Sequence, residues 1–142
     1  MPYVKIWVHL VWSTKNRYPF LKKEFRQTVF EHIKQNTKGK GIYLDCVNGY
    51  EDHIHCLVSL SSDQTISKLL QLIKGESSFW INQQKLCSPK FEWQEEYFAV
   101  SVSHSQLQNV RTYIFNQESH HQQKTFQQEY DEFVSKYEFE KA

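Results

Sequence analysis

The sequence lacks long hydrophobic runs, paired cysteines and a secretory leader. No apolar stretch approaches the roughly 20 residues that a membrane-spanning helix needs. Residues 1–5 lead directly into a strand-like pattern, without the charged and apolar segments of a signal peptide. The three cysteines are widely spaced and form no CxxC pair, which favours reduced thiols. We therefore expect a cytoplasmic protein without disulfides.

The chain also has little net charge, only +1 over 142 residues. Nine lysines and arginines fall within residues 5–40, whereas the segment after residue 128 is mostly acidic. Such a distribution can present one phosphate-attracting face, but ordinary solvated helices give the same pattern. Charge alone therefore identifies no partner. The length and the 39% hydrophobic content predict one domain over residues 1–142.

Hydrophobic periodicity predicts alternating strands and helices followed by two further helices. Strands are expected over 4–14, 42–48, 52–60 and 91–103, and helices over 21–37, from a cap at Asp63 or Thr65 to about residue 80, over 106–119, and over about 125–138. The order of the first six elements predicts an α+β, ferredoxin-like antiparallel sheet with helices on one face. In that layout the first strand and the 52–60 strand are central neighbours.

The 52–60 strand carries two histidines on one face. Its residues alternate, with Ile54, Cys56 and Val58 on one side and His53, His55 and Leu57 on the other. Two imidazoles two residues apart on a strand project side by side. Their neutral nitrogens can share one divalent cation, although such a pair is also common on a solvated face.

Tyr113 and Gln117 offer a possible completion of this site. They are four residues apart on the predicted 106–119 helix and therefore share a face. Facing the histidines, Gln117 would give the metal a carbonyl oxygen and Tyr113 would place a phenol beside it. A cation there favours the phenolate. Taken singly, the two residues would be a half-buried aromatic and a surface amide.

Neighbouring polar residues are weaker candidates. Glu118 could compete with Gln117 as a ligand, but it lies about 100° further round the helix. We expect His120 and His121 to be a solvated helix end. His9 lies on the more polar face of the first strand, and we do not assign it to the site.

The pattern Asp-His-hydrophobic-His at 52–55, followed some sixty residues later by Tyr-x-x-x-Gln, resembles the HUH-type single-tyrosine transposases of small bacterial insertion sequences. REP-associated tyrosine transposases are among the relatives. The opening strand with 12–17, the continuation 116–121 and the closing 126–137 helix are also similar. The likeness spans nearly the whole chain.

The resemblance implies an HUH endonuclease fold and assigns roles to four residues. His53, His55 and Gln117 match the family's metal ligands, with Mg²⁺ or Mn²⁺ as the ion, and Tyr113 matches the nucleophile. The implied reaction is transesterification on single-stranded DNA through a 5′-phosphotyrosine. The implied partners are DNA hairpins at element ends and a second subunit, whose tyrosine helix often completes the shared site.

Three basic residues are candidates for DNA contact: Lys15, Arg17 and Arg111. Three alternatives to the transposase remain. A non-catalytic module could stack bases on an open sheet face, although no RNP-like aromatic motif is present. A histidine-triad hydrolase would need a third histidine where Leu57 stands. A host-domesticated relative would retain cleavage without mobility, and flanking genomic DNA would distinguish it.

Overall fold

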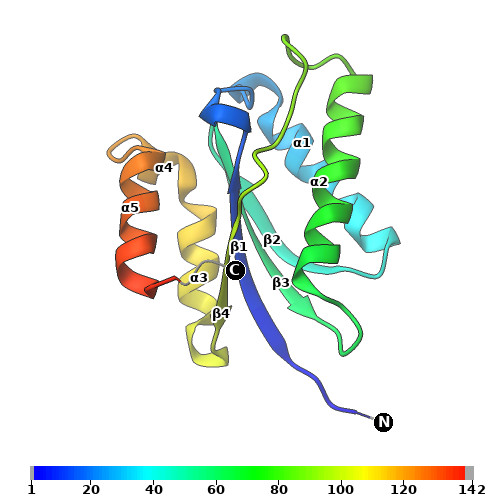
Figure 1. The fold of residues 1–142 in the computed structure, drawn as a ribbon, viewed down its shortest axis with the longest axis vertical. Helices are drawn as coiled ribbons and strands as arrows, with labels where there is room; N and C mark the ends of the chain where they lie inside the picture. The colour runs from blue at the N-terminus through cyan, green and yellow to red at the C-terminus, as the bar shows by residue number, and fades with distance from the viewer. Residues whose placement is uncertain (1, 140–142) are drawn as a thin grey trace.

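The protein is built on a four-stranded antiparallel sheet with strand order β2-β3-β1-β4. A computed structural model describes residues 2–139 (Figure 1). The strands are β1 (Ile6–Ser13), β2 (Tyr43–Gly49), β3 (His53–Leu60) and β4 (Phe98–Val102), and the helices are α1 (Lys23–Gly39), α2 (Ile66–Gln83), α3 (Leu107–Phe115), α4 (Gln117–His121) and α5 (Phe126–Tyr137), with short 3₁₀ turns η1 (Lys15–Arg17) and η2 (His104–Gln106). The predicted ferredoxin-like α+β class is confirmed, with β1 and β3 neighbours at the centre.

Helices lie on both faces of the sheet (Figure 1). Helices α1 and α2 cover the face to which Ile54, Cys56 and Val58 point, and these three side chains belong to the main hydrophobic core. Helices α3, α4 and α5 cover the opposite face, which the sequence prediction left open. A module that stacks bases on an open sheet face is therefore excluded, because that face is the floor of a second packed layer.

The predicted 106–119 helix is wrong as a single helix. The chain forms α3 and then α4, with a break at Asn116, whose φ of −93° and ψ of 21° are not helical. Asn48 of β2 explains the break, because its side-chain amide donates to the carbonyls of Ile114 and Phe115 at 3.0 Å each. Those two carbonyls are therefore satisfied without a continuing helix.

The predicted 91–103 strand is too long, since only its last part forms β4. The residues before β4 form only an isolated bridge, between Trp93 and Thr14, and they also bond to α2. The Lys74 ammonium donates to the carbonyls of Gln94 and Glu95 at 2.6 and 3.1 Å. On α2 itself, Phe79 is 66% exposed.

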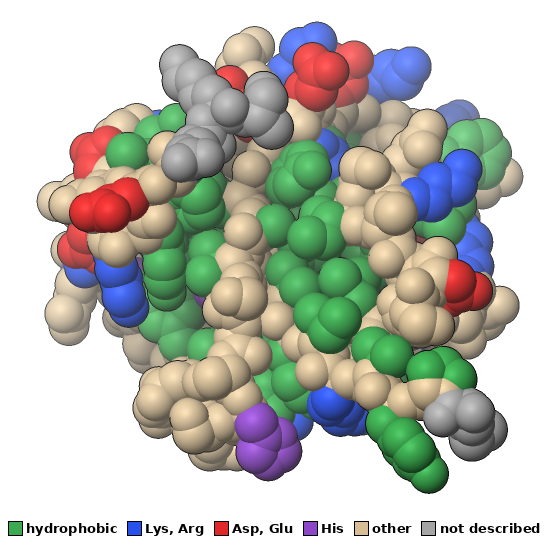
Figure 2. All heavy atoms as spheres, turned by 60° about the horizontal axis from the view of Figure 1, so that its bottom comes forward, with side chains coloured by type: hydrophobic (Ala, Val, Ile, Leu, Met, Phe, Trp, Pro, Cys, Tyr) green, Lys and Arg blue, Asp and Glu red, His purple; other side chains and the backbone are tan. Residues whose placement is uncertain are grey.

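The surface carries few strong features. Within residues 2–139 the cysteines are free thiols, and no helix has the length and apolar character needed to cross a membrane. Figure 2 shows hydrophobic side chains gathered in the middle of one face, with charged ones at its margins.

Among the described residues β4 pairs only with β1, so β4 is an edge strand. Strand β1 lies between β3 and β4 and is not available as an edge.

Candidate active site

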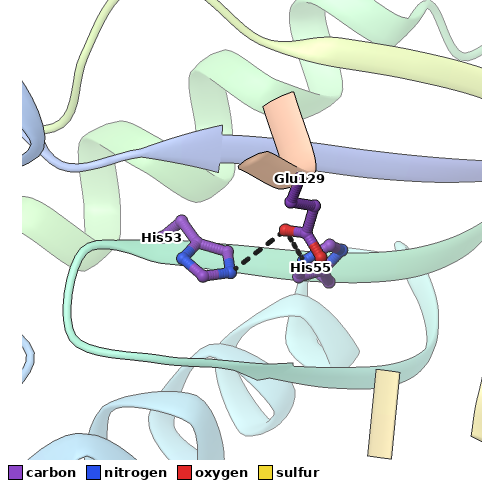
Figure 3. Close-up of side chains that lie close together, drawn as sticks. All are labelled: His53, His55 and Glu129. Atoms are coloured by element: carbon purple, nitrogen blue, oxygen red, sulfur yellow. Dashed lines mark hydrogen bonds and ion pairs between the residues drawn. The ribbon is translucent and has the colours of Figure 1, made fainter. Parts of the chain in front are cut away.

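Strand β3 carries His53 and His55 side by side (Figure 3), on the face of the sheet that α3, α4 and α5 cover (Figure 1). Both side chains are fully buried. His53 Nδ1 donates to Asp52 Oδ1 at 2.8 Å, and the His53 ring stacks on Phe126 with 4.3 Å between centroids. These contacts fix the ring and direct Nε2 into the site, as metal-binding histidines are usually held. The strand geometry predicted from the alternation is confirmed.

Helix α5 contributes a carboxylate that sequence reasoning missed. Glu129 is almost completely buried, and its Oε1 lies 3.1 Å from His55 Nε2 and 3.4 Å from His53 Nε2 (Figure 3). Phe126 and Phe133, three residues before and four after it, are also buried on this helix. A charged residue at an apolar position was the available signal, because a buried carboxylate needs partners.

Tyr113 and Gln117 meet at the same place, although they belong to different helices. Gln117 is fully buried, with Oε1 3.2 Å from His53 Nε2, while its amide NH₂ donates to the Tyr113 carbonyl at 3.2 Å. The Tyr113 ring lies edge-on to His55 at 5.6 Å, and its hydroxyl donates to Glu129 Oε2. One chain therefore brings the proposed nucleophile to its own histidines.

Two neighbouring residues, His9 and His121, lie differently from expectation, whereas Glu118 lies as expected. His9 of β1 reaches the site, with Nε2 2.9 Å from His55 Nδ1. His121 is not at a solvated helix end, because its side chain is 2% exposed and its Nε2 lies 3.6 Å from Glu129 Oε1. Glu118 points elsewhere and pairs with Lys23 at 3.4 Å.

Burial sets the protonation of this cluster. It lowers the pKa of His55 to about 4, and burial together with the neighbouring His55 lowers the pKa of His9 to about 3. Burial by itself would raise the pKa of Glu129, but the imidazoles of His121 and His55 beside it hold that pKa far below its usual range. Burial and the Glu129 charge raise the pKa of Tyr113. At neutral pH the site thus holds neutral His9 and His55, a carboxylate and a protonated phenol.

The donor set fits a divalent metal ion. The buried group of His53, His55 and Glu129 offers two imidazole nitrogens and a carboxylate oxygen that all lie within 4.8 Å of one another. Donor atoms around one ion with bonds of about 2.1 Å are about 3.0–3.4 Å apart, which the two Glu129 separations match. Gln117 Oε1 lies at a similar distance from His53, so the predicted third ligand is in reach of the same position.

The predicted DNA-contact residues lie in two places: Lys15 and Arg17 belong to the η1 turn, and Arg111 belongs to α3. Lys15 forms an exposed pair with Glu92 at 3.5 Å. The Arg17 guanidinium lies 5.2 Å from the centroid of the Phe126 ring, beside the covered histidines. Arg111 makes two hydrogen bonds to Asp45, at 2.8 and 3.2 Å, so its charge is largely compensated.

Comparison with known proteins adds a family and three relatives. The family model described as "Transposase IS200 like" matches residues 2–117. The ISDra2 transposase TnpA of Deinococcus radiodurans is 23% identical over 117 residues, which cover 77% of this chain and 81% of that protein.

Two solved structures share the fold. A putative transposase from Deinococcus radiodurans R1 has a TM-score of 0.62 and 23% identity, covering 82% of this chain and 95% of the other. A REP-associated tyrosine transposase bound to a REP hairpin has a TM-score of 0.61 and 17% identity, covering 85% of this chain and 72% of the other. Both likenesses cover the greater part of the sheet-and-helix arrangement described above.

Proposed function

Because the chain belongs to the IS200-like transposase family, we propose that it cuts and rejoins single-stranded DNA at hairpin-flanked element ends, with Tyr113 as the nucleophile. The observation that carries this proposal is the position of the Tyr113 phenol. Its ring lies 5.6 Å from that of His55, and its hydroxyl contacts Glu129, which lies between both β3 histidines. Among the eight tyrosines, Tyr113 is the one four residues before a buried amide that faces a histidine.

The proposed reaction is a transesterification without external energy. The Tyr113 oxygen bonds to the phosphorus of the scissile phosphodiester as the bond from phosphorus to the 3′ oxygen breaks. The phenol loses its proton and the departing 3′ oxygen gains one, which leaves a 3′-hydroxyl and a 5′-phosphotyrosine. Attack by a 3′-hydroxyl on that phosphotyrosine rejoins DNA. Glu129 Oε2, which accepts the phenol hydrogen bond, is the nearest acceptor for the proton.

The proposed metal ligands include His53, His55 and Gln117. A bound Mg²⁺ or Mn²⁺ would polarise a phosphoryl oxygen and neutralise charge that develops on it. His53→Ala and His55→Ala should each abolish cleavage while hairpin binding and folding persist, and a chelator should have the same effect on the wild type. Full cleavage in excess chelator would reject the metal role.

Hairpin binding and dimerisation are part of the same proposal. The REP-associated relative was solved with a REP hairpin, and Lys15 and Arg17 are accessible candidates for phosphate contact beside the covered site. A second copy could add to the edge of β4, which has a strand partner on one side only among the described residues. Light scattering at micromolar concentration, with and without DNA, tests the dimer; a monomer in both conditions contradicts it.

Replacing Tyr113 by Phe tests the nucleophile. Tyr113→Phe removes one oxygen, so the fold and DNA affinity should persist, while the covalent adduct and cleavage should vanish. The measurement is denaturing electrophoresis of protein incubated with labelled hairpin DNA, followed by peptide mapping of any adduct. Tyr97→Phe is the matched control, because Tyr97 is exposed just before β4. An adduct on another tyrosine, or wild-type cleavage by Tyr113→Phe, would show that the nucleophile has been misidentified.

A further inference from the structure

His121 has a buried nitrogen that lacks a partner. Its side chain is 2% exposed, and within residues 2–139 its Nε2 has no hydrogen-bond partner. Its other nitrogen, Nδ1, lies 2.7 Å from the carbonyl oxygen of Lys124. A carbonyl can only accept, so Nδ1 carries the proton and a neutral His121 presents a lone pair at Nε2. Buried polar atoms of this kind normally bind something.

The lone pair of His121 faces other electron-rich atoms. Glu129 Oε1 lies 3.6 Å from His121 Nε2, 3.4 Å from His53 Nε2 and 3.1 Å from His55 Nε2. His53 donates from Nδ1 to Asp52, so its Nε2 also presents a lone pair when the ring is neutral. Lone pairs and a carboxylate oxygen repel one another unless a cation lies among them. Glu129 is the shared member of two groups of donor atoms that lie within 4.8 Å of one another, one with His53 and His55 and the other with His120 and His121. The charge distribution around Glu129 is that of an ion-binding site.

The surrounding residues fix the orientation of the His121 ring. Gln117 and His121 are the first and last residues of α4, four apart, so both share the helix face turned to β3. The His121 ring stacks on Tyr50 with 5.4 Å between centroids and lies edge-on to His53 at 4.4 Å. A ring fixed by stacking on one side and by the Lys124 carbonyl is oriented in the way that ligand histidines usually are.

We propose that His121 and Glu129 are ligands of the same ion as His53 and His55, which makes the centre a transition-metal site with three imidazoles and one carboxylate beside the Gln117 oxygen proposed above. This inference rests on the metal dependence proposed above. It adds two ligands that lie beyond residues 2–117, the part of the chain that the family model matches. Mg²⁺ favours oxygen ligands and retains water, whereas imidazole nitrogens favour later divalent ions. Zn²⁺ and Co²⁺ should therefore bind more tightly than Mn²⁺, and Mn²⁺ more tightly than Mg²⁺.

The number of bound histidines can be counted in the wild-type chain. Co²⁺ shifts the proton resonances of a bound imidazole far outside the usual range, and each bound histidine contributes one shifted N–H signal that disappears in D₂O. Three such signals are expected for His53, His55 and His121. Two signals would leave His53 and His55 as the imidazole ligands and would overturn the assignment of His121. This measurement needs no variant, so misfolding cannot obscure it.

Calorimetry of metal-free protein titrated with Zn²⁺ and Mn²⁺ gives the second test. His121→Phe keeps an aromatic ring for Tyr50, and Glu129→Gln keeps the shape of the side chain; each should weaken binding at least about 10-fold. His120→Phe is the matched control, because His120 Nε2 lies 3.3 Å from the other carboxylate oxygen, Oε2. It should bind like the wild type. If His120→Phe loses as much metal affinity as His121→Phe, the ion lies on the Oε2 side of Glu129, and the proposed ligand set is overturned.

His53→Ala separates this inference from the proposed function. If His53→Ala abolishes binding while His121→Phe and Glu129→Gln bind like the wild type, the inference fails and the metal site of the proposed function stands. If the wild type binds no ion, or His53→Ala binds like the wild type, the metal role fails as a whole. Tighter binding of Mg²⁺ than of Zn²⁺ by the wild type would contradict the imidazole-rich site.

Discussion

At the scale of single residues, the site is a chain of buried imidazoles linked across two strands. His9 Nε2 contacts His55 Nδ1 at 2.9 Å, and His55 Nε2 contacts Glu129 at 3.1 Å. If His9 donates to His55, His55 Nε2 carries a proton that it can donate to Glu129; if His55 donates to His9, His55 Nε2 has a lone pair that can bind a metal. Two adjacent charged imidazoles would repel in this dry environment, which is why the low pKa values of the pair follow from its position.

This pair predicts a specific loss of stability in mild acid. The pKa of His55 is about 4 and that of His9 about 3, against an ordinary value of 6.5. The unfolded chain takes up protons below about pH 6.5 while the folded chain does not, so the free energy of unfolding falls as the pH drops from about 6.5 towards 4. Each histidine contributes up to about 1.4 kcal/mol per pH unit. Urea denaturation between pH 7 and 4.5, with a chelator present, measures this pH dependence of the free energy of unfolding.

Two variants test whether these histidines cause the loss. His9→Gln retains a hydrogen-bonding side chain but cannot titrate in this range, so it should make the pH dependence less steep. His104→Ala alters an exposed histidine at the start of η2 and should leave the dependence unchanged. A pH dependence in His9→Gln as steep as in the wild type would show that other groups titrate.

At the scale of elements, local sequence patterns predicted the features that depend on local interactions, namely the faces of strands and the bounds of helices. The alternation in 52–60 assigned both faces of β3 correctly, and helical spacing located α1 and α5 to within a few residues. The break between α3 and α4 depends on Asn48, which is 66 residues before Ile114. No pattern within 106–119 carries that information. The prediction of a solvated His121 failed for the same reason, since the turn at Asn116 rotates its side chain inward.

The N-cap of α5 provides a test of this element's role. The Thr125 hydroxyl accepts from the Gln128 N–H in a capping box, and Glu129 lies in the first turn. Thr65 caps α2 by the same kind of bond to Lys68, on the other face of the sheet. Thr125→Ala and Thr65→Ala should each reduce the free energy of unfolding by about 1 kcal/mol.

Cleavage activity should distinguish these two caps. Thr125→Ala loosens the turn that holds Glu129 and should reduce DNA cleavage, whereas Thr65→Ala should retain it at a temperature where both remain folded. Urea denaturation and the hairpin cleavage assay are the two measurements. Equal loss of cleavage in both variants would indicate a general effect of stability, with no special part for α5.

At the scale of the whole molecule, the packing of the C-terminal helices on the sheet determines which residues form the site. The sequence predicted the ferredoxin-like class and the central pair of β1 and β3, because six alternating elements with short connections allow few arrangements. It did not predict that α3, α4 and α5 cover the second face, since that contact joins segments far apart in the chain. This covering layer brings Tyr113 and Glu129 to the β3 histidines, so the complete constellation lies within one chain.

A mixing experiment tests this arrangement within the proposed dimer. His53→Ala retains Tyr113, and Tyr113→Phe retains the histidines, so each chain alone should be inactive. If each tyrosine serves the histidines of its own chain, a mixed dimer contains no complete site, and differently tagged chains purified together should cleave no hairpin DNA. Wild-type chains carrying the same two tags are the control and should cleave normally. Recovery of cleavage in the mixed dimer would show that Tyr113 crosses to the partner's histidines, with α3 placed differently from the arrangement within this chain.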